Sequence, residues 1–231
     1  MADPVEYDRA PTMFSPDGRL LQVEYAKKTV KQGSSTIGLV VKDGAIIIAD
    51  KRILDPLIIK EYVEKIYEID DHIIASAAGI ISDARILMDY ARIKAMQHRL
   101  TFGNYIDILE LVKEVSDIQQ IYTQVGGHRP FGVSLIIAGY DFQPMVYATD
   151  PVGIYFPYYA VAIGSGEEKM MEFLHKNYKQ NLSIEEGIKL GLDCLKEAVE
   201  TLVPDRISIK YVTKEKKIIS ISPEDIKKFI K

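Results

Sequence analysis

The sequence has very little cysteine and no long apolar run, and both shortages narrow the classes of protein that it can encode. Cys194 is the single cysteine among 231 residues, so no disulfide can form within the chain, which is typical of a reducing compartment. Its apolar surroundings predict a small core residue rather than a nucleophile. No apolar run approaches the length that spans a bilayer, and the first residues lack a signal pattern. We expect a cytoplasmic protein with no membrane partner.

Positive charge is not in excess either. The chain has 29 Lys and Arg against 33 Asp and Glu, a formal net charge of −4 that leaves no basic footprint for nucleic acid. The four histidines (His72, His98, His128 and His175) lack the spacing of metal ligands, and no glycine-rich loop opens a helix to hold a phosphate. The sequence therefore predicts no metal, no cofactor and no nucleic-acid partner.

The remaining composition is that of an ordinary globular domain. Hydrophobic residues make up 47% and charged residues 27% of the chain, and 231 residues suit one large domain. No linker, repeat or low-complexity segment divides it.

Local patterns predict segregated runs of helices and strands. Ser15-Pro16-Asp17-Gly18 has turn chemistry, and Gly33 ends the amphipathic helix that begins near Leu20. Ser82 is the expected N-cap of a long helix, and Ser183 with Glu186 forms an expected capping box. Further helices are expected at 106–122 and after Ser222, and strands at 36–41, 45–49, 63–69, 73–78, 133–138, 145–149, 153–155, 160–163 and 207–212.

This order predicts an α+β fold rather than an alternating parallel one. Strands such as 45–49 and 135–138 are apolar on both faces, so each sheet should be covered on both sides. A four-layer αββα sandwich, with two antiparallel sheets flanked by helices, meets both demands.

Several short motifs are spread along nearly the whole chain. The N-terminal ones are Tyr7-Asp8-Arg9, Phe14-Ser15-Pro16-Asp17-Gly18-Arg19-Leu20 and Gln22-Val23-Glu24-Tyr25-Ala26. The later ones are Val63-Glu64-Lys65-Ile66, Ala78-Gly79 with Ser82-Asp83-Ala84-Arg85, Gly127-His128-Arg129-Pro130-Phe131-Gly132-Val133-Ser134-Leu135, Asp150-Pro151-Val152-Gly153 and Ala162-Ile163-Gly164-Ser165-Gly166. Each motif alone is weak, but together, in this order and at this spacing, they resemble those of proteasome α-type subunits. The resemblance implies the fold of N-terminal-nucleophile hydrolases.

The resemblance also bears on catalysis. Gly33-Ser34-Ser35-Thr36-Ile37-Gly38 resembles the first strand of such a hydrolase, whose nucleophile needs a free α-amine, yet 33 residues precede Ser34. Asp50 and Lys65 match the positions of an acid and a lysine in catalytic β-type subunits, whereas Ser208 falls near the position of another acid. A non-catalytic α-type subunit is the favoured interpretation. An autoprocessed threonine-type endopeptidase cleaved between Gly33 and Ser34, or a related dodecameric protease scaffold, remains the alternative.

In family terms, seven α-type copies form a ring, and two such rings cap two rings of catalytic β-type subunits. Residues 1–34 would be a gating tail and ring-contact helix, and residues 35–231 the αββα domain. The implied partners are further copies of this chain in a homoheptameric, archaeal-type ring, β-type subunits, an ATP-dependent unfoldase activator with a C-terminal docking tail, and unfolded polypeptide substrates.

Three sites follow from the resemblance. The gate comprises Tyr7, Asp8, Arg9, Pro16 and Tyr25. A pocket for the activator's C-terminal carboxylate comprises the cation Lys65 with Gly18, Glu24, Gly33 and Gly79. The annulus of the pore comprises Val125, Gly126, Gly127 and His128, where two glycines let backbones approach closely, so that only unfolded polypeptide would pass.

Overall fold

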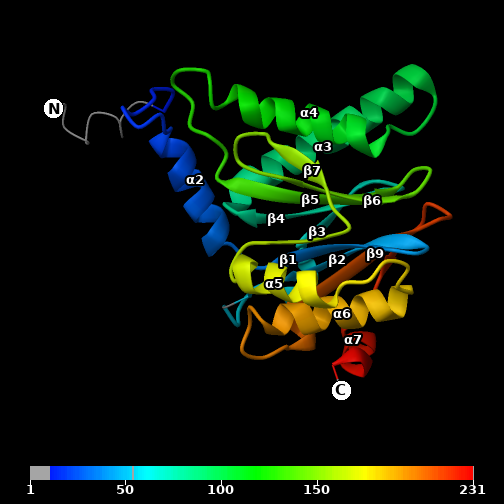
Figure 1. Ribbon diagram of the computed structural model, residues 1–231. Coiled ribbons are helices and arrows are strands. Elements are labelled where there is room, and N and C mark those ends of the chain that lie inside the picture. Colours follow the sequence, from blue (N-terminus) through cyan, green and yellow to red (C-terminus); the bar gives the residue numbers. More distant parts are fainter. Residues whose placement is uncertain (1–10, 54, 231) are drawn as a thin grey trace.

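Two stacked antiparallel sheets lie between layers of helices in the computed structural model, which describes residues 11–53 and 55–230 (Figure 1). The first sheet has the order β10-β9-β2-β1-β8 and the second the order β3-β4-β5-β6-β7. The first contains β1 (Thr36–Val41), β2 (Gly44–Asp50), β8 (Ala160–Ile163), β9 (Ile207–Thr213) and β10 (Ile218–Ser220). The second contains β3 (Ile66–Asp70), β4 (Ile73–Gly79), β5 (Val133–Tyr140), β6 (Pro144–Thr149) and β7 (Tyr155–Pro157). The predicted αββα sandwich is confirmed.

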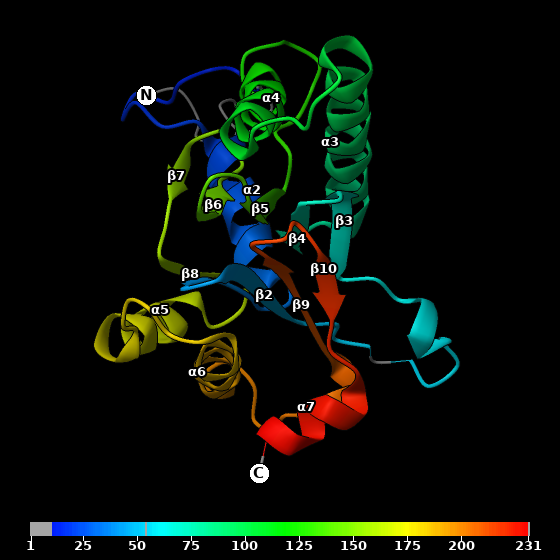
Figure 2. The same cartoon turned by 90° about the vertical axis from the view of Figure 1, so that its right-hand side faces the viewer.

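Helices cover both outer faces of this sandwich (Figures 1 and 2). The second sheet is covered by α3 (Ile81–Phe102) and α4 (Ile108–Ile121), and the first by α5 (Glu167–Asn177), α6 (Ile184–Lys196) and α7 (Pro223–Phe229). Among the described residues, one further α-helix, α2 (Leu21–Gln32), lies across one end of the sandwich and contacts β4 and β5. Within the described residues, no helix is long and apolar enough to cross a membrane.

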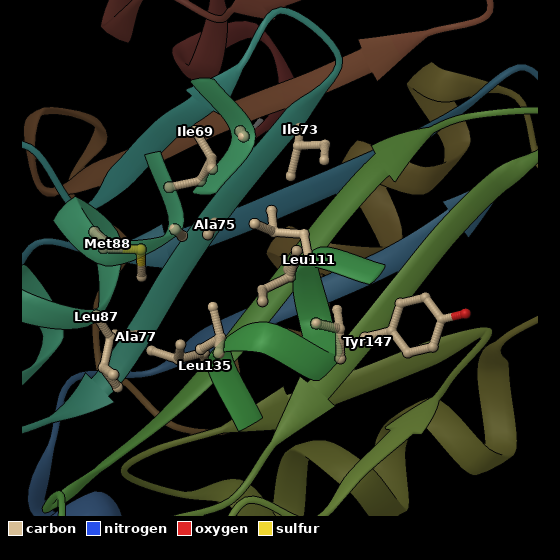
Figure 3. Close-up of a cluster of buried hydrophobic side chains, with 14 of the residues drawn as sticks. Ile69, Ile73, Ala75, Ala77, Leu87, Met88, Leu111, Leu135 and Tyr147 are labelled. Atoms are coloured by element: carbon tan, nitrogen blue, oxygen red, sulfur yellow. The ribbon is translucent and has the colours of Figure 1, made fainter. Parts of the chain in front are cut away.

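Alternation along the central strands explains why they are apolar on both faces. In β4, Ile73, Ala75 and Ala77 belong to the core under α3 and α4, whereas Ile74 and Ala78 belong to the core between the sheets. Figure 3 shows the first of these cores, where side chains of α3, α4, β4 and β5 pack together. Every residue of β2 and of β5 is buried, as two covered faces require.

Several local predictions are confirmed. The Ser15 turn closes with a hydrogen bond from the Gly18 amide to the Ser15 carbonyl, 2.8 Å long, and Gly18 has the positive φ of 75° that glycine adopts readily. Ser183 forms the capping box with Glu186 at the start of α6. Cys194 is fully buried, and burial raises the pKa of its thiol to about 12, so it is a core residue as expected.

Ser82 is not an N-cap. The N-cap position of α3 belongs to Ile80, whose side chain makes no capping bond, and the helix begins at Ile81. The Ile80 amide instead donates to the Gly132 carbonyl at 2.9 Å, so a contact with another part of the chain sets where α3 begins.

Two strand boundaries also differ from the prediction. The strand expected from Val63 begins at Ile66, because residues Lys60–Tyr62 form a 3₁₀ turn that the Val63 amide closes. The strand expected over 153–155 is β7 (Tyr155–Pro157), because Gly153 lies in a turn with a φ of 81° and bonds back to Asp150.

Candidate functional site

The hydroxyl residues ahead of the first strand line a cleft. The pairing of β1 with β2 brings Asp50, the last residue of β2, beside Ser35, and the Asp50 amide donates to the Ser35 carbonyl at 3.0 Å. The Ser35 hydroxyl donates to the Ser165 carbonyl at 2.7 Å. Ser34, Ser35, Asp50, Ser165 and Arg206 are among the residues around this cleft, whose volume is about 370 Å³. Thr36 turns away from it, with its Oγ1 3.3 Å from the Ser76 Oγ between the sheets.

Asp50 is held by an arginine that the sequence analysis missed. The Asp50 side chain is buried, and one terminal nitrogen of Arg206 lies 2.9 and 3.2 Å from its two carboxylate oxygens. The Arg52 amide also donates to Asp50 Oδ1 at 2.9 Å. Both carboxylate oxygens of Asp50 therefore accept hydrogen bonds within the protein. A general base needs a free lone pair directed at its substrate, so this arrangement does not suit that role.

Lys65 lies close to this cluster but is turned to a different partner. Its ammonium donates to the carbonyl oxygen of Ala77 on β4. Burial lowers the pKa of Lys65 from its ordinary value to about 8, and the negative charge of Asp50 offsets part of that effect. Asp50 thus acts on Lys65 through its charge, while its hydrogen bonds come from the Arg206 side chain and the Arg52 amide.

The nitrogen of Ser34 belongs to a peptide bond within ordered backbone. The Gly33 carbonyl accepts a hydrogen bond from the Ser165 amide at 2.8 Å, and the Gly33 amide donates to the last turn of α2. Val23, Ala26 and Val30 anchor α2 by burial. The hydroxyls of this cluster therefore lie behind a folded helix with no free amine to activate them.

A layered αββα sandwich with serines ahead of its first strand is the scaffold of an N-terminal-nucleophile hydrolase, here without the terminal amine. Within the described residues, no group of three or more His, Cys, Asp or Glu side chains could hold a metal ion.

Comparisons with known proteins identify the family. The family model of proteasome subunits matches residues 30–212, and the N-terminal signature of A-type proteasome subunits matches residues 7–28. The proteasome alpha subunit of Archaeoglobus fulgidus is 47% identical over 226 residues, which cover 97% of this chain and 92% of that protein. That of Methanocaldococcus jannaschii is 45% identical over 232 residues, covering 100% and 89%. That of Thermococcus sibiricus is 45% identical over 223 residues, covering 96% and 86%.

This chain belongs to the proteasome subunit family and is of the α type, which is the non-catalytic type. The alternative of an autoprocessed, β-type endopeptidase is therefore wrong, because the segment that would be discarded carries the α-type signature.

The predicted gate residues are only partly described. Tyr7, Asp8 and Arg9 lie outside the described residues. Pro16 lies in the turn that precedes α2, and Tyr25 lies on α2 with 40% of its surface exposed. The ammonium of Lys28 lies 5.3 Å from the centre of the Tyr25 ring, a cation–π contact on the surface of α2.

The residues of the predicted activator pocket form two groups. Gly33 and Gly79 are in contact, and Lys65 reaches Ala77, two residues before Gly79 on the same strand. Gly18 and Glu24 lie toward the other end of α2, where Glu24 pairs with Arg19 at 3.2 Å. The nine helical steps from Glu24 to Gly33 correspond to about 13 Å along the axis. A single chain therefore does not gather all five residues.

The predicted annulus residues lie on the exposed loop between α4 and β5 (Figure 1). Gly126 and Gly127 have open space where a Cβ would lie, and Gly127 has a φ of 83°. His128 packs its ring against Tyr122 with the ring centres 5.0 Å apart. The structure thus brings Val125, Gly126, Gly127 and His128 together at one exposed tip.

Proposed function

We propose that this chain gates the admission of unfolded polypeptide to a proteolytic chamber and docks an ATP-dependent activator. As a proteasome α subunit it assembles with α- and β-type subunits in the core particle. The proposed arrangement is a homoheptameric outer ring in a cytoplasmic particle. The observation that carries the proposal is the folded α2, which continues through Gly33 into the peptide nitrogen of Ser34, where a catalytic relative needs a free terminal amine.

The gate is proposed to act through the turn at Pro16. Proline fixes its own φ, and the turn is closed at both ends because Ser15 and Arg19 also bond each other through their backbones at 2.8 Å. A stiff turn transmits a displacement to the chain before it. Tyr7, Asp8 and Arg9 would then order neighbouring tails through stacking, hydrogen bonds and opposite charges.

The activator pocket is proposed to form between neighbouring copies. Lys65, Gly33 and Gly79 of one copy would meet Gly18 and Glu24 of the next, because these two groups lie at opposite ends of α2. Among the side chains that the structure describes, no carboxylate lies within ion-pair distance of Lys65. The C-terminal carboxylate of an activator would supply one, in a charge-assisted contact worth roughly 1.5–3 kcal/mol.

Reconstitution tests the proposed function. The chain should hydrolyse no peptide when purified alone, keep its full mass, and form a larger particle with a catalytic β-type subunit that does hydrolyse peptides. Substitution of the nucleophile in the β-type subunit should abolish that activity. Hydrolysis by this chain alone, or loss of its first 33 residues, would contradict the proposal.

A further inference from the structure

The loop between α4 and β5 is exposed at its tip but anchored on both sides. Residues 124–129 are exposed, whereas Pro130 and Phe131 are buried. On the helix side, the Val125 amide bonds the Ile121 carbonyl at 3.1 Å and the Thr123 hydroxyl bonds the Gln120 carbonyl at 2.6 Å. On the strand side, the anchor with the most hydrogen bonds is one side chain from another element.

That side chain is Asp83, in the first turn of α3. Arg129 donates two hydrogen bonds to it, from Nη1 to Oδ2 at 2.6 Å and from Nη2 to Oδ1 at 2.7 Å. The Gly132 amide donates a third to Oδ2 at 2.9 Å. Burial alone would raise the pKa of Asp83, but the bonds from Arg129 and Gly132 outweigh burial and lower the pKa.

Gly132 connects this anchor to α2. Its carbonyl oxygen accepts hydrogen bonds from the Ile80 amide at 2.9 Å and from the Thr29 hydroxyl of α2 at 2.8 Å. A Cβ on Gly132 would lie 2.6 Å from the side chain of Ile80 and 2.7 Å from the Thr29 hydroxyl, so the approach is close. The loop tip is therefore fixed to the helix on which the proposed gate depends.

We propose that Asp83 and Arg129 are positioning residues of the annulus, and that their paired bonds set how wide a polypeptide can pass. The inference rests on the proposed role of Val125–His128 as that annulus. Exposed ion pairs contribute little, and the Arg129 side chain is 57% exposed, but the Asp83 side chain is only 10% exposed. Loss of Arg129 therefore leaves a largely buried carboxylate with the Gly132 amide as its remaining donor. The two parallel bonds need the planar fork of arginine, which lysine lacks.

The test compares two forms of one substrate. Particles are assembled with a catalytic β-type subunit from chains lacking residues 1–11, so that the gate plays no part. A polypeptide closed into a loop by one disulfide must pass the annulus as a double strand, whereas the reduced form passes as a single strand. Arg129→Met and Asp83→Asn should each raise the ratio of closed-loop to reduced degradation severalfold, without raising hydrolysis of a short peptide.

Control variants separate positioning from stability. Arg129→Lys should give an intermediate ratio, and Arg85→Met, on the exposed face of the same helix, should give the unchanged ratio. An unchanged ratio in Arg129→Met and Asp83→Asn overturns the inference, even if their melting temperatures fall. If chains with Arg129→Met fail to assemble into particles, the ratio measured for Arg129→Lys tests the inference instead. Val125→Gly tests the annulus itself, because Val125 is one of its proposed residues. If this variant alone changes the ratio, the positioning role of Asp83 and Arg129 is wrong but the annulus stands. If no variant changes the ratio, the assignment of the annulus is wrong.

Discussion

Gly33 and Gly79 meet backbone to backbone, since a Cβ on Gly33 would lie 2.1 Å from the Gly79 amide nitrogen. Gly33 ends α2 and Gly79 ends β4, so this contact fixes where the N-terminal helix joins the sandwich. Gly33 has a φ of −67°, which any residue can adopt. Glycine is required there by the close approach and not by the backbone conformation.

Gly33→Ala should therefore lower stability by roughly 1–3 kcal/mol, because the added methyl group meets backbone that cannot move aside without shifting α2 or β4. Thermal unfolding would measure the effect. Gly126→Ala is the matched control, because nothing lies within 4 Å of the position of its Cβ. Equal melting temperatures for the two variants would show that the contact between Gly33 and Gly79 does not require glycine at position 33.

Lys65 should make stability depend on pH in an alkaline window. Its native pKa is about 8 against an ordinary 10.5, so between these values the unfolded chain binds more protons than the folded one. The free energy of unfolding should therefore gain a contribution that rises with pH across this window. Lys65→Met should remove that contribution and stabilise the chain at neutral pH, on the order of 1–3 kcal/mol. Denaturant unfolding of the native protein and of Lys65→Met across this pH window measures the contribution of Lys65. Identical dependence of the unfolding free energy on pH in the two proteins would refute the prediction.

The same lysine should govern activation. Lys65→Ala should abolish stimulation of the assembled particle by a peptide that carries the activator's C-terminus, because the docked carboxylate loses its cation. Docking to the native protein should weaken above pH 8, up to about tenfold per pH unit, as the ammonium deprotonates. Lys60→Ala, which replaces an exposed lysine five positions earlier in the chain, is the control that should respond normally. If the peptide still activates particles that carry Lys65→Ala, the assignment of Lys65 to the activator pocket is wrong.

Arg206→Met should destabilise the chain by roughly 1–3 kcal/mol, because Asp50 stays buried after losing its ion-pair partner. The side chain of Arg206 is 34% exposed, so water can replace part of its bonding. Adding Asp50→Asn to that variant should restore part of the loss, which a double-mutant cycle would measure. A double variant less stable than Arg206→Met would contradict the pairing.

Much of the fold was predictable because its signals are local. The Ser15 turn, the two strands expected at 36–41 and 45–49 and the Ser183 capping box each depend on neighbouring residues, and each is found where expected. The doubly apolar strands likewise predicted sheets that are covered on both sides.

Local turns displaced the starts of β3 and β7, but the other failures arise where residues far apart in the sequence are in contact. Ser82 looked like an N-cap, but α3 begins where Gly132 binds Ile80, some fifty positions along the chain. The Asp50–Arg206 pair joins residues 156 positions apart, and the Asp83–Arg129 pair joins residues 46 apart. No local pattern marks either pair. Ser165, in contrast, belongs to the Gly164–Gly166 motif. That motif could have predicted that Ser165 lies at the cleft beside Ser34 and Ser35.

The measurement that tests the central claim most directly is peptide hydrolysis by the assembled particle with and without residues 1–11 of this chain. If the chain is a gate rather than an enzyme, the deletion should raise hydrolysis severalfold without an activator, and the activity should still depend entirely on the nucleophile of the β-type subunit. An unchanged rate would contradict the gate, and activity that survives loss of that nucleophile would contradict the non-catalytic assignment.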